Sequence, residues 1–446
     1  MAENEKIGEE KMRSFYILWV GQFLSIFASK MTGFAITLWA WDLTGSATAL
    51  VLVGVAYTLP GAIFSPFAGA LIDRWNRKLI IMLSDFSAAL STFVLLILFA
   101  TNRIEMWHIY VSVIFSGIFG SFQYPAYSSV ITMMVPKEQY SRANSLRSLI
   151  SSASGIGAPL LAGALLLVMD ISGIMVIDLI TFFIAIGTLL LIHIPQPKES
   201  AAGKAGKGSI WTETMHGFKY IRARESLFGI FLLFAFSNIA ASFIFPMISP
   251  MILSKTGSDS VILGTIKSVG SVGFLVGGII TSVWVGPKKR IHGINLSFIL
   301  WGLLGAFVFG LGWNIYAWVI GAFFISLFNP IINSFYIAIL QAKIEPDLQG
   351  RIFGLENSIS TITFPLGQLI AGLSVDHLLE PALMPGGSLA GSIGRITGTG
   401  AGAGIGLIIV IGGILAILTG IAGYLIKPIR EIETLLPDPE PSPNPI

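Results

Sequence analysis

The chain has 446 residues, of which 54% are hydrophobic and 11% charged, and its formal net charge is +3. Soluble domains carry roughly 25% charged residues, so this composition and a mean hydropathy of +0.80 predict a protein that is solvated mainly by lipid. The small net charge gives no reason to expect nucleic acid as a partner, and the absence of cysteine excludes disulfides and thiolate-bound metals.

Twelve apolar segments, six in each half of the chain, are long enough to cross a membrane. In the first half they cover residues 14–41, 47–72, 79–101, 107–135, 144–168 and 171–194. In the second half they cover residues 226–253, 261–285, 292–312, 315–342, 352–376 and 404–426. Within lipid a helix pairs all of its own backbone groups. We therefore expect an all-α membrane protein with twelve transmembrane helices in two pseudo-symmetric six-helix bundles.

The predicted domains follow from this division. We expect an N-terminal bundle at 1–196, a cytoplasmic linker at 197–225, a C-terminal bundle at 226–430 and a disordered tail at 431–446. The linker is basic, flexible by composition in its first part and a candidate amphipathic surface helix in its second. A loop at 377–403, rich in glycine and proline, is expected on the opposite side of the membrane. It forms either a lid over an outer opening or a surface excursion without a role.

The distribution of basic residues tests the predicted topology. If the N-terminus is cytoplasmic, the segments on the cytoplasmic side contain 22 of the 27 Lys and Arg residues. The outer loops contain three, and two lie within spans. Cytoplasmic loops are enriched in Lys and Arg, and a missed or extra helix would invert half of the count. The pattern therefore places both termini in the cytoplasm.

The most informative turn joins the second and third spans. It reads Gly69-Ala-Leu-Ile-Asp73-Arg74-Trp-Asn-Arg77-Lys78 and places one acid and three cations between two nearly uncharged helices. Such a turn suits a latch between two moving parts. Related stretches recur in the second half, with a basic turn at 286–290 and a segment at 346–351 that partly matches 136–142. Transporters use repeats of this kind to build a site near the membrane midplane.

These motifs resemble the major facilitator superfamily along nearly the whole chain. The turn at 69–78 is similar to the family's loop between helices 2 and 3, although Asn76 stands where glycine is usual. The stretch from Gly155 to Gly163 is similar to the Gly/Pro signature of exporters, although Ala158 precedes the proline where glycine is usual.

Three further stretches, at 125–126, 177–182 and 217–222, resemble the macrolide-efflux and enterobactin-exporter branch of the superfamily. The resemblance implies a cavity lined by spans 1, 4, 7 and 10. In one respect the chain departs from the pattern. Drug–proton antiporters usually place an arginine in span 4, where this chain has Ser116 or a close neighbour.

Two lysines lie inside predicted spans. Lys30 is near the middle of the first span, where lysine costs roughly 2.5–3.5 kcal/mol unless it meets water or a partner. We interpret it as a cation in a cavity that binds an anionic substrate or pairs with an acid. A purely structural ion pair is the alternative. The same argument applies to Lys267 in span 8, which lies nearer the interface and can extend toward it.

Asp178 in span 6 is the best candidate for proton coupling. Coupling requires a buried acid that takes up and releases a proton near neutral pH, and Asp178 could also neutralise Lys30. Its alternative role is to brace the helix. Glu356, near the cytoplasmic end of span 11, is the second candidate acid and is more typical of a gate.

Five amide side chains fall in spans 1, 4, 7 and 10, the helices that line the cavity in the resembled fold. A buried amide usually has a hydrogen-bond partner, so each one either joins helices or contacts substrate. As a set they favour a polar channel, and we take them as candidate substrate-binding residues: Gln22, Gln123, Asn238, Asn329 and Asn333.

The candidate gating residues come from two motifs and one acid. In the latch, Asp73 can meet the N-terminal dipole of span 11, while Arg74 and Arg77 can pair with Glu356 or Asp85. In span 5, glycines and a proline allow close helix approach and a bend. The full set is Gly69, Asp73, Arg74, Arg77, Lys78, Glu356, Gly155 and Pro159.

Nothing in the sequence indicates an enzyme, a metal site or a cofactor. No phosphate-binding loop of the Gly-x-x-x-x-Gly-Lys-[Ser/Thr] type occurs, so the chain itself cannot use ATP. The five histidines are scattered and form no pair at metal-ligand spacing.

The leading hypothesis is therefore a secondary active exporter of the cell inner membrane. It would export amphiphilic small molecules by alternating access, in exchange for protons. The resemblance implies macrolide-like drugs, siderophores or peptide natural products as substrates. We expect a monomer in the lipid bilayer without nucleic acid partners. The alternatives are uptake or lipid flipping by a similar fold, and a membrane sensor that does not transport.

Overall fold

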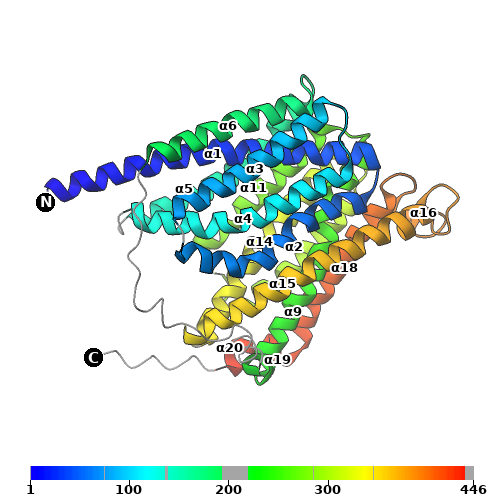
Figure 1. Ribbon diagram of the computed structural model, residues 1–446. Helices are drawn as coiled ribbons and strands as arrows, with labels where there is room; N and C mark the ends of the chain where they lie inside the picture. Colours follow the sequence, from blue (N-terminus) through cyan, green and yellow to red (C-terminus); the bar gives the residue numbers. More distant parts are fainter. Residues whose placement is uncertain are drawn as a thin grey trace. The chain divides into compact units, whose positions relative to one another are not determined.

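Every regular element in the described part of the chain is a helix (Figure 1). The computed structural model describes residues 2–74, 76–135, 139–192, 219–284, 286–344 and 346–436. Most of the predicted linker and the predicted tail from residue 437 onward lie outside these residues. The expectation of an all-α protein is confirmed.

Each of the six spans predicted in the first half corresponds to one long helix (Figure 1). The helices are α1 (Ala2–Thr44), α2 (Ala47–Arg74), α3 (Arg77–Ala100), α4 (Met106–Met134), α5 (Tyr140–Leu165) and α6 (Ile171–Leu191). Their apolar composition fits lipid on one side and neighbouring helices on the other.

Three of the six spans in the second half are interrupted helices. The seventh consists of α9 (Glu225–Ile244), η2 (Phe245–Met247) and α10 (Ile248–Thr256). The ninth consists of α12 (Arg290–Leu300), the π-helical segment η3 (Trp301–Phe307) and α13 (Val308–Gly310). The eleventh consists of α15 (Pro346–Ser374), the π-helical η4 (Val375–Leu379) and α16 (Glu380–Leu383). The others are α11 (Ser260–Val283), α14 (Ile315–Lys343) and α18 (Ala403–Leu425).

Eleven helices in the described residues are long and apolar enough to cross a membrane. The remaining predicted span, the fourth, corresponds to α4, which is 29 residues long. The structure therefore agrees with the prediction of a helical membrane protein and has a helix in every predicted position.

The helices form two compact units. Unit 1 contains Met1–Ser200 together with Ile252–Ser268, and unit 2 contains Ala201–Met251 together with Val269–Ile446. The segment Ile252–Ser268 of unit 1 packs against α5. There, the hydroxyl of Ser260 donates to the carbonyl of Gly163 at 3.0 Å, and that of Ser268 to the carbonyl of Ile156 at 2.5 Å.

Glycines allow helices α2 and α4 of unit 1 to touch along their backbones. A Cβ atom on Gly61 would lie 2.7 Å from the carbonyl oxygen of Gly117, and one on Gly117 would overlap the carbonyl oxygen of Tyr57. Helices α11 and α14 of unit 2 approach in the same way. There, a Cβ on Gly273 would overlap the carbonyl oxygen of Phe323. Small residues at helix crossings supply the packing that holds helices together in lipid.

Gly117→Ala is expected to destabilise the protein by about 1–3 kcal/mol, because the added methyl forces α2 and α4 apart. Gly187→Ala in α6 is the matched control, since nothing lies within 4 Å of the Cβ it would add. Thermal unfolding of the purified variants in detergent measures the difference. Equal transition temperatures for the two variants would show that this crossing tolerates separation.

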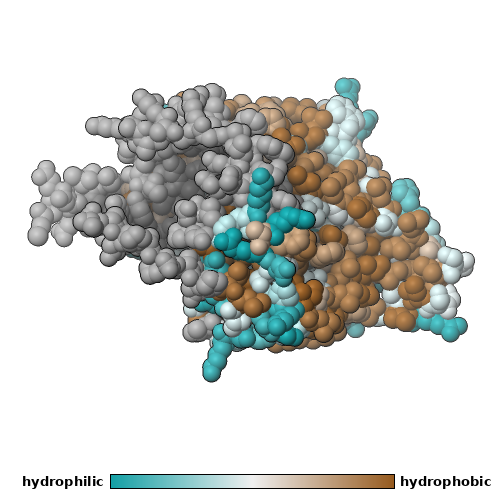
Figure 2. Space-filling view, turned by 90° about the horizontal axis from the view of Figure 1, so that it is seen from below, coloured by the Kyte–Doolittle hydropathy of each residue, from teal (hydrophilic) through white to brown (hydrophobic). Residues whose placement is uncertain are grey.

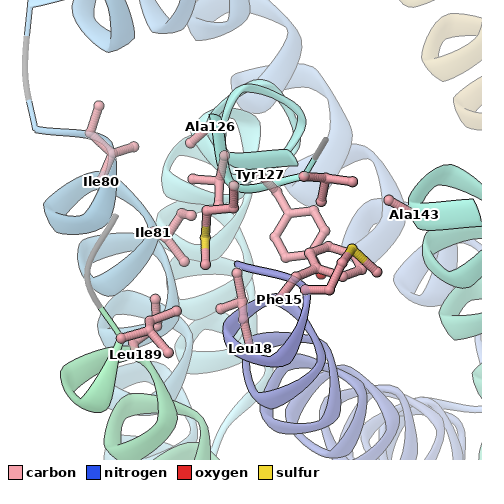
Figure 3. Close-up of a cluster of buried hydrophobic side chains, with 13 residues drawn as sticks. Phe15, Leu18, Ile80, Ile81, Ala126, Tyr127, Ala143 and Leu189 are labelled. Atoms are coloured by element: carbon pink, nitrogen blue, oxygen red, sulfur yellow. The ribbon is translucent and has the colours of Figure 1, made fainter. Parts of the chain in front are cut away.

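Two clusters of buried apolar side chains lie within unit 1. Figure 3 shows the larger one, in which side chains from α1, α3, α4, α5 and α6 converge, among them Phe15, Ile81 and Tyr127. The smaller one joins Ile36, Leu95, Ile109 and Met175 near the other ends of the helices. The two clusters enclose a polar middle layer of unit 1.

The Gly/Pro-rich loop at 377–403 folds into a compact structure against α18. It contains α16 and the short α17 (Gly394–Thr397). The carboxylate of Glu380 accepts hydrogen bonds from the backbone N–H groups of Gly402 (2.5 Å) and Gly404 (2.9 Å) at the start of α18. This is where a helix dipole stabilises negative charge.

The end of the described chain is more ordered than predicted. Residues 431–436, expected to begin the tail, follow α19 (Lys427–Arg430) and include α20 (Ile432–Leu435). Glu433 accepts a hydrogen bond from the backbone N–H of Ile291, and Lys343 donates to the carbonyl of Leu436 at 2.8 Å. These bonds hold the segment against unit 2.

Candidate functional site

A polar cavity of about 520 Å³ lies in unit 1, between the two apolar clusters. Helices α1, α2, α3, α4 and α6 supply its lining. Three charged side chains take part, namely Lys30, Asp85 and Asp178. Hydroxyl groups line much of the rest, from Ser25, Ser29, Thr32, Ser84, Ser91, Thr92, Ser112 and Ser116. This volume falls in the range of small-molecule sites.

Asp178, the predicted proton-coupling residue, lies on this cavity and is 5% exposed. Two hydroxyl groups donate to its carboxylate. Ser29 of α1 donates to Oδ1 at 2.8 Å, and Thr92 of α3 donates to Oδ2 at 3.0 Å. Since a hydroxyl can donate or accept by rotating, the two partners can satisfy either a charged or a protonated carboxyl group.

Asp85 of α3 also lines the cavity, a position that was not predicted from the sequence. It is also 5% exposed. The amide of Gln22 donates to Oδ2 and that of Gln123 to Oδ1, each at 2.7 Å. The three side chains join α1, α3 and α4. The sequence indicates Asp85 only as a partner for the latch arginines, because it follows the latch closely in the chain.

Lys30 lines the cavity, and the expected pairing with Asp178 does not form. Its Nζ atom donates to the carbonyl oxygen of Ser151 in α5 at 3.2 Å. Asp178 instead bonds the two hydroxyls described above. The reason is geometric, since Lys30 reaches the backbone of α5 while Asp178 faces α1 and α3.

Ser116 occupies the part of α4 where the resembled antiporters carry an arginine. Its hydroxyl donates to that of Ser91 in α3 at 3.1 Å, and both residues line the cavity. Near Ser91 and Ser116, the side of the cavity formed by α3 and α4 is therefore polar and uncharged. Of the two predicted amides in unit 1, Gln123 lines the cavity, whereas Gln22 is 1% exposed and held by Asp85.

The three predicted asparagines of the second half meet in unit 2. Asn238 of α9 and Asn329 and Asn333 of α14 line one small pocket of about 60 Å³. Asn238 donates to the hydroxyl of Ser360 in α15 at 2.9 Å, and Asn333 donates to the carbonyl of Asn329 at 2.9 Å. The sequence grouped these three asparagines with Gln22 and Gln123, whereas the structure places the asparagines on a separate pocket.

Two other predicted residues lie elsewhere. Lys267, in the part of α11 that belongs to unit 1, is half-buried and is not among the residues that line the cavity. Glu356 of α15, in unit 2, lies beside Tyr336 of α14, whose ring stacks on that of Phe234.

Part of the latch can be described. Asn76 caps α3, and its Oδ1 accepts from the backbone N–H of Lys78 at 3.0 Å. Asparagine is a favoured cap at this position, which gives the departure from glycine a physical reason. Lys78 donates to the carbonyls of Leu190 (3.3 Å) and Ile192 (2.8 Å) at the end of α6. The side chains of Asp73, Arg74 and Arg77, like the surroundings of Gly69, lie outside the described residues.

The Gly/Pro stretch of α5 packs closely on the N-terminal part of α11 within unit 1. Pro159 lies inside α5, and a Cβ on Gly264 would be 2.5 Å from its carbonyl oxygen. A Cβ on Gly163 would likewise be 2.5 Å from the carbonyl oxygen of Ser260. Gly155 lies one turn before Pro159 in the same helix. These residues form a helix crossing rather than part of the cavity lining.

The cavity can hold and orient a polar or charged molecule in the middle of a membrane protein. Among the described residues, no group of three His, Asp or Glu side chains is placed to bind a metal ion. Its ionisable groups can exchange protons with a bound molecule or with water.

Comparison with known proteins identifies the family. The sequence model of the Major Facilitator Superfamily matches residues 18–368. The chain belongs to this superfamily. It is therefore a multi-pass membrane transporter and not an enzyme, as the sequence analysis predicted.

Characterised relatives of this major facilitator transporter include efflux proteins. Macrolide efflux protein A of Streptococcus pyogenes is 27% identical over 379 residues, which cover 84% of this chain and 92% of the relative. The enterobactin exporter EntS of Shigella boydii is 22% identical over 369 residues, which cover 80% and 84% of the two chains. The resemblance to the efflux branch is thereby confirmed.

Solved structures confirm the fold of this major facilitator transporter. A bacterial homologue of the human lysosomal transporter Spinster superposes with a TM-score of 0.67 at 15% identity, covering 96% of this chain and 99% of the other. A bacterial homologue of the iron transporter ferroportin gives 0.65 at 14% identity, covering 92% and 98%. At these identities the likeness concerns the fold alone.

Proposed function

We propose that this transporter exports amphiphilic small molecules in exchange for protons, with the unit 1 cavity as the substrate and proton site. The observation that supports this most directly is the pair of buried carboxyl groups, Asp85 and Asp178, on a polar cavity inside a membrane protein. Ionisable groups at such depth are costly and mark substrate or proton pathways. The efflux proteins among the relatives favour export over uptake.

The two carboxyl groups have different partners, which suggests different roles. Amide N–H groups only donate, so Gln22 and Gln123 favour the charged form of Asp85. Protonation of Asp85 would require one amide to turn over. Asp178 is bonded to hydroxyls that adapt to either form. We assign the exchanging proton to Asp178 and a lasting negative charge to Asp85.

The charge of the cavity then favours a monocationic substrate. With Asp85 and Asp178 ionised and Lys30 protonated, the three groups sum to one negative charge. Either a proton on Asp178 or a substrate with one positive charge cancels it. An uncompensated buried charge is strongly destabilising, so occupancy by one or the other is favoured over both or neither. This reasoning supports amphiphilic amines, including macrolide-like compounds, over anionic siderophores.

The transport cycle also requires an orientation in the membrane and gates on both sides of the cavity. We place the protein in the cell inner membrane with both termini on the cytoplasmic side, because the basic residues are concentrated in the segments of that side. The protein acts as a monomer, and movements of its six-helix halves open the cavity alternately to the two sides of the membrane. The latch at 69–78 and Glu356 serve as inner gates, and the α5–α11 crossing around Pro159 serves as the gate on the other side.

Everted membrane vesicles test the proposal. With this transporter present, a pH gradient (acid inside) is expected to drive accumulation of a radiolabelled macrolide that carries a protonated dimethylamino group. For one-for-one exchange, one pH unit stores ~1.4 kcal/mol, enough for about tenfold accumulation. A protonophore should abolish the accumulation.

The charge of the substrate is tested in the same vesicles. A neutral form of the macrolide, in which an acetyl group replaces one of the two N-methyl groups, should accumulate far less than the parent compound. Equal accumulation of both would contradict the charge argument, while proton-driven export itself would stand. Absence of gradient-driven flux for macrolides and for other amphiphilic amines would contradict the proposed function.

A further inference from the structure

A second site lies in unit 2, on the outside of the helices. An apolar groove of about 530 Å³ runs between α9 and α18 and ends at α19. Its lining is almost entirely apolar and includes Gly229, Phe236, Leu418, Ile426 and Ile429. Thr419 is the one lining residue with a polar side chain, and its hydroxyl bonds the carbonyl of Leu415 at 2.7 Å.

The walls of the groove face outward along the membrane-spanning length of α9 and α18. Phe236 is 59% exposed and Leu418 is 54% exposed. Gly229 shapes the end near α19, because a Cβ there would lie 2.7 Å from the side chain of Ile429. A groove with such walls is complementary to a hydrocarbon chain and to little else.

Basic residues gather at the end of the groove where α9 begins and α18 ends. Lys427 lies between the lining residues Ile426 and Ile429 and is exposed. Arg222, also exposed, has its guanidinium 5.8 Å from the ring centre of Phe228, the neighbour of Gly229.

Arg224 and Arg430 add two further cations at this end. Arg224 stacks on Tyr220, and Arg430 donates to the carbonyl of Tyr424 at 3.2 Å. Figure 2, which views this face, shows hydrophilic side chains gathered beside a broad hydrophobic area.

The acids near this end only partly offset the cations. Glu431 is paired with Arg430 at 3.2 Å. Glu433 is occupied by the backbone N–H of Ile291. Glu225 is the first residue of α9, where the helix dipole favours a carboxylate. Arg222 and Lys427 thus contribute positive charge at the mouth of the groove.

From this arrangement we infer that the groove binds an anionic phospholipid. One acyl chain lies in the groove between α9 and α18, and the phosphate lies at Arg222 and Lys427. Basic pockets between membrane helices on the cytoplasmic side bind anionic headgroups, and each Lys or Arg near an anionic surface contributes about one kcal/mol. This end of the groove is also the side that the basic residue distribution places in the cytoplasm. The inference is independent of the transported substrate.

Native mass spectrometry of the delipidated, purified full-length protein tests the inference. Phosphatidylglycerol and phosphatidylcholine with identical acyl chains serve as probes. We expect the first molecule of phosphatidylglycerol to bind about 30-fold more tightly than phosphatidylcholine. The double variant Arg222→Gln/Lys427→Gln should weaken phosphatidylglycerol binding roughly 30-fold, with little change for phosphatidylcholine.

Matched variants separate this site from general lipid contact. Lys288→Gln/Lys289→Gln removes two cations from the turn before α12 in the same unit and should leave both affinities unchanged. Leu418→Trp fills the groove and should weaken both lipids, whereas Ile320→Trp, at an equally outward position of α14, should not. Equal binding of the two lipids, or equal losses in the two charge variants, would overturn the inference.

Discussion

Asp178→Asn is expected to abolish proton-driven accumulation in everted vesicles while the protein stays folded. The asparagine keeps the size of the side chain, and the hydroxyls of Ser29 and Thr92 can rotate to match an amide. It cannot exchange a proton, so the ~1.4 kcal/mol stored in each pH unit no longer drives transport. By the same charge balance, the variant should also bind the cationic substrate more weakly, because Asp85 and Lys30 then already cancel each other.

The control for this prediction lies on the same helix. Asp170 is the exposed residue that precedes α6, and its side chain makes no capping hydrogen bond. Asp170→Asn should transport like the unmodified protein. If Asp178→Asn, present in equal amount, accumulates substrate normally, the coupling proton is carried by another group.

Asp85→Leu is expected to destabilise the protein strongly. The leucine removes the acceptor for two amides, one of which belongs to Gln22 at 1% exposure. An unsatisfied buried group costs about 1–3 kcal/mol, which applies in full to Gln22, whereas Gln123 lies on the cavity and adds less. Thermal unfolding in detergent measures the loss. Phe86→Leu, at the exposed neighbouring position, should have little effect.

A repair experiment decides whether the missing acceptor causes the loss. Adding Gln22→Leu and Gln123→Leu to Asp85→Leu removes both stranded donors, and stability should recover in large part. Transport should not recover, because the cavity has lost a negative charge. If stability fails to recover, the loss comes from packing rather than from unpaired amides.

Much of the fold could be predicted from the sequence, for a clear physical reason. A lipid-spanning helix requires a long apolar segment, and basic residues mark the cytoplasmic loops. Each span can therefore be recognised from its own residues, and every predicted span corresponds to a helix. The interruptions by η2, η3 and η4 were not predicted, because the hydropathy of a span does not distinguish one type of helix from another.

The candidate site was predictable in part. Lys30 and Asp178 were recognised because isolated charges are rare in spans, and both line the cavity. Asp85 lies near the charged turn, so its sequence position suggested a partner there rather than a place on the cavity. The proposed pair of Lys30 with Asp178 failed because spacing along the chain does not say which way a side chain points around a helix.

By itself, the sequence determined the positions of the long apolar helices, the expected sidedness and the family, because hydropathy, loop charge and short motifs are local properties. Only the tertiary structure decided that Gln22 and Gln123 hold Asp85 while Ser29 and Thr92 hold Asp178. Those contacts join residues far apart in the chain. They depend on how each helix is rotated and packed against its neighbours, which no single segment encodes.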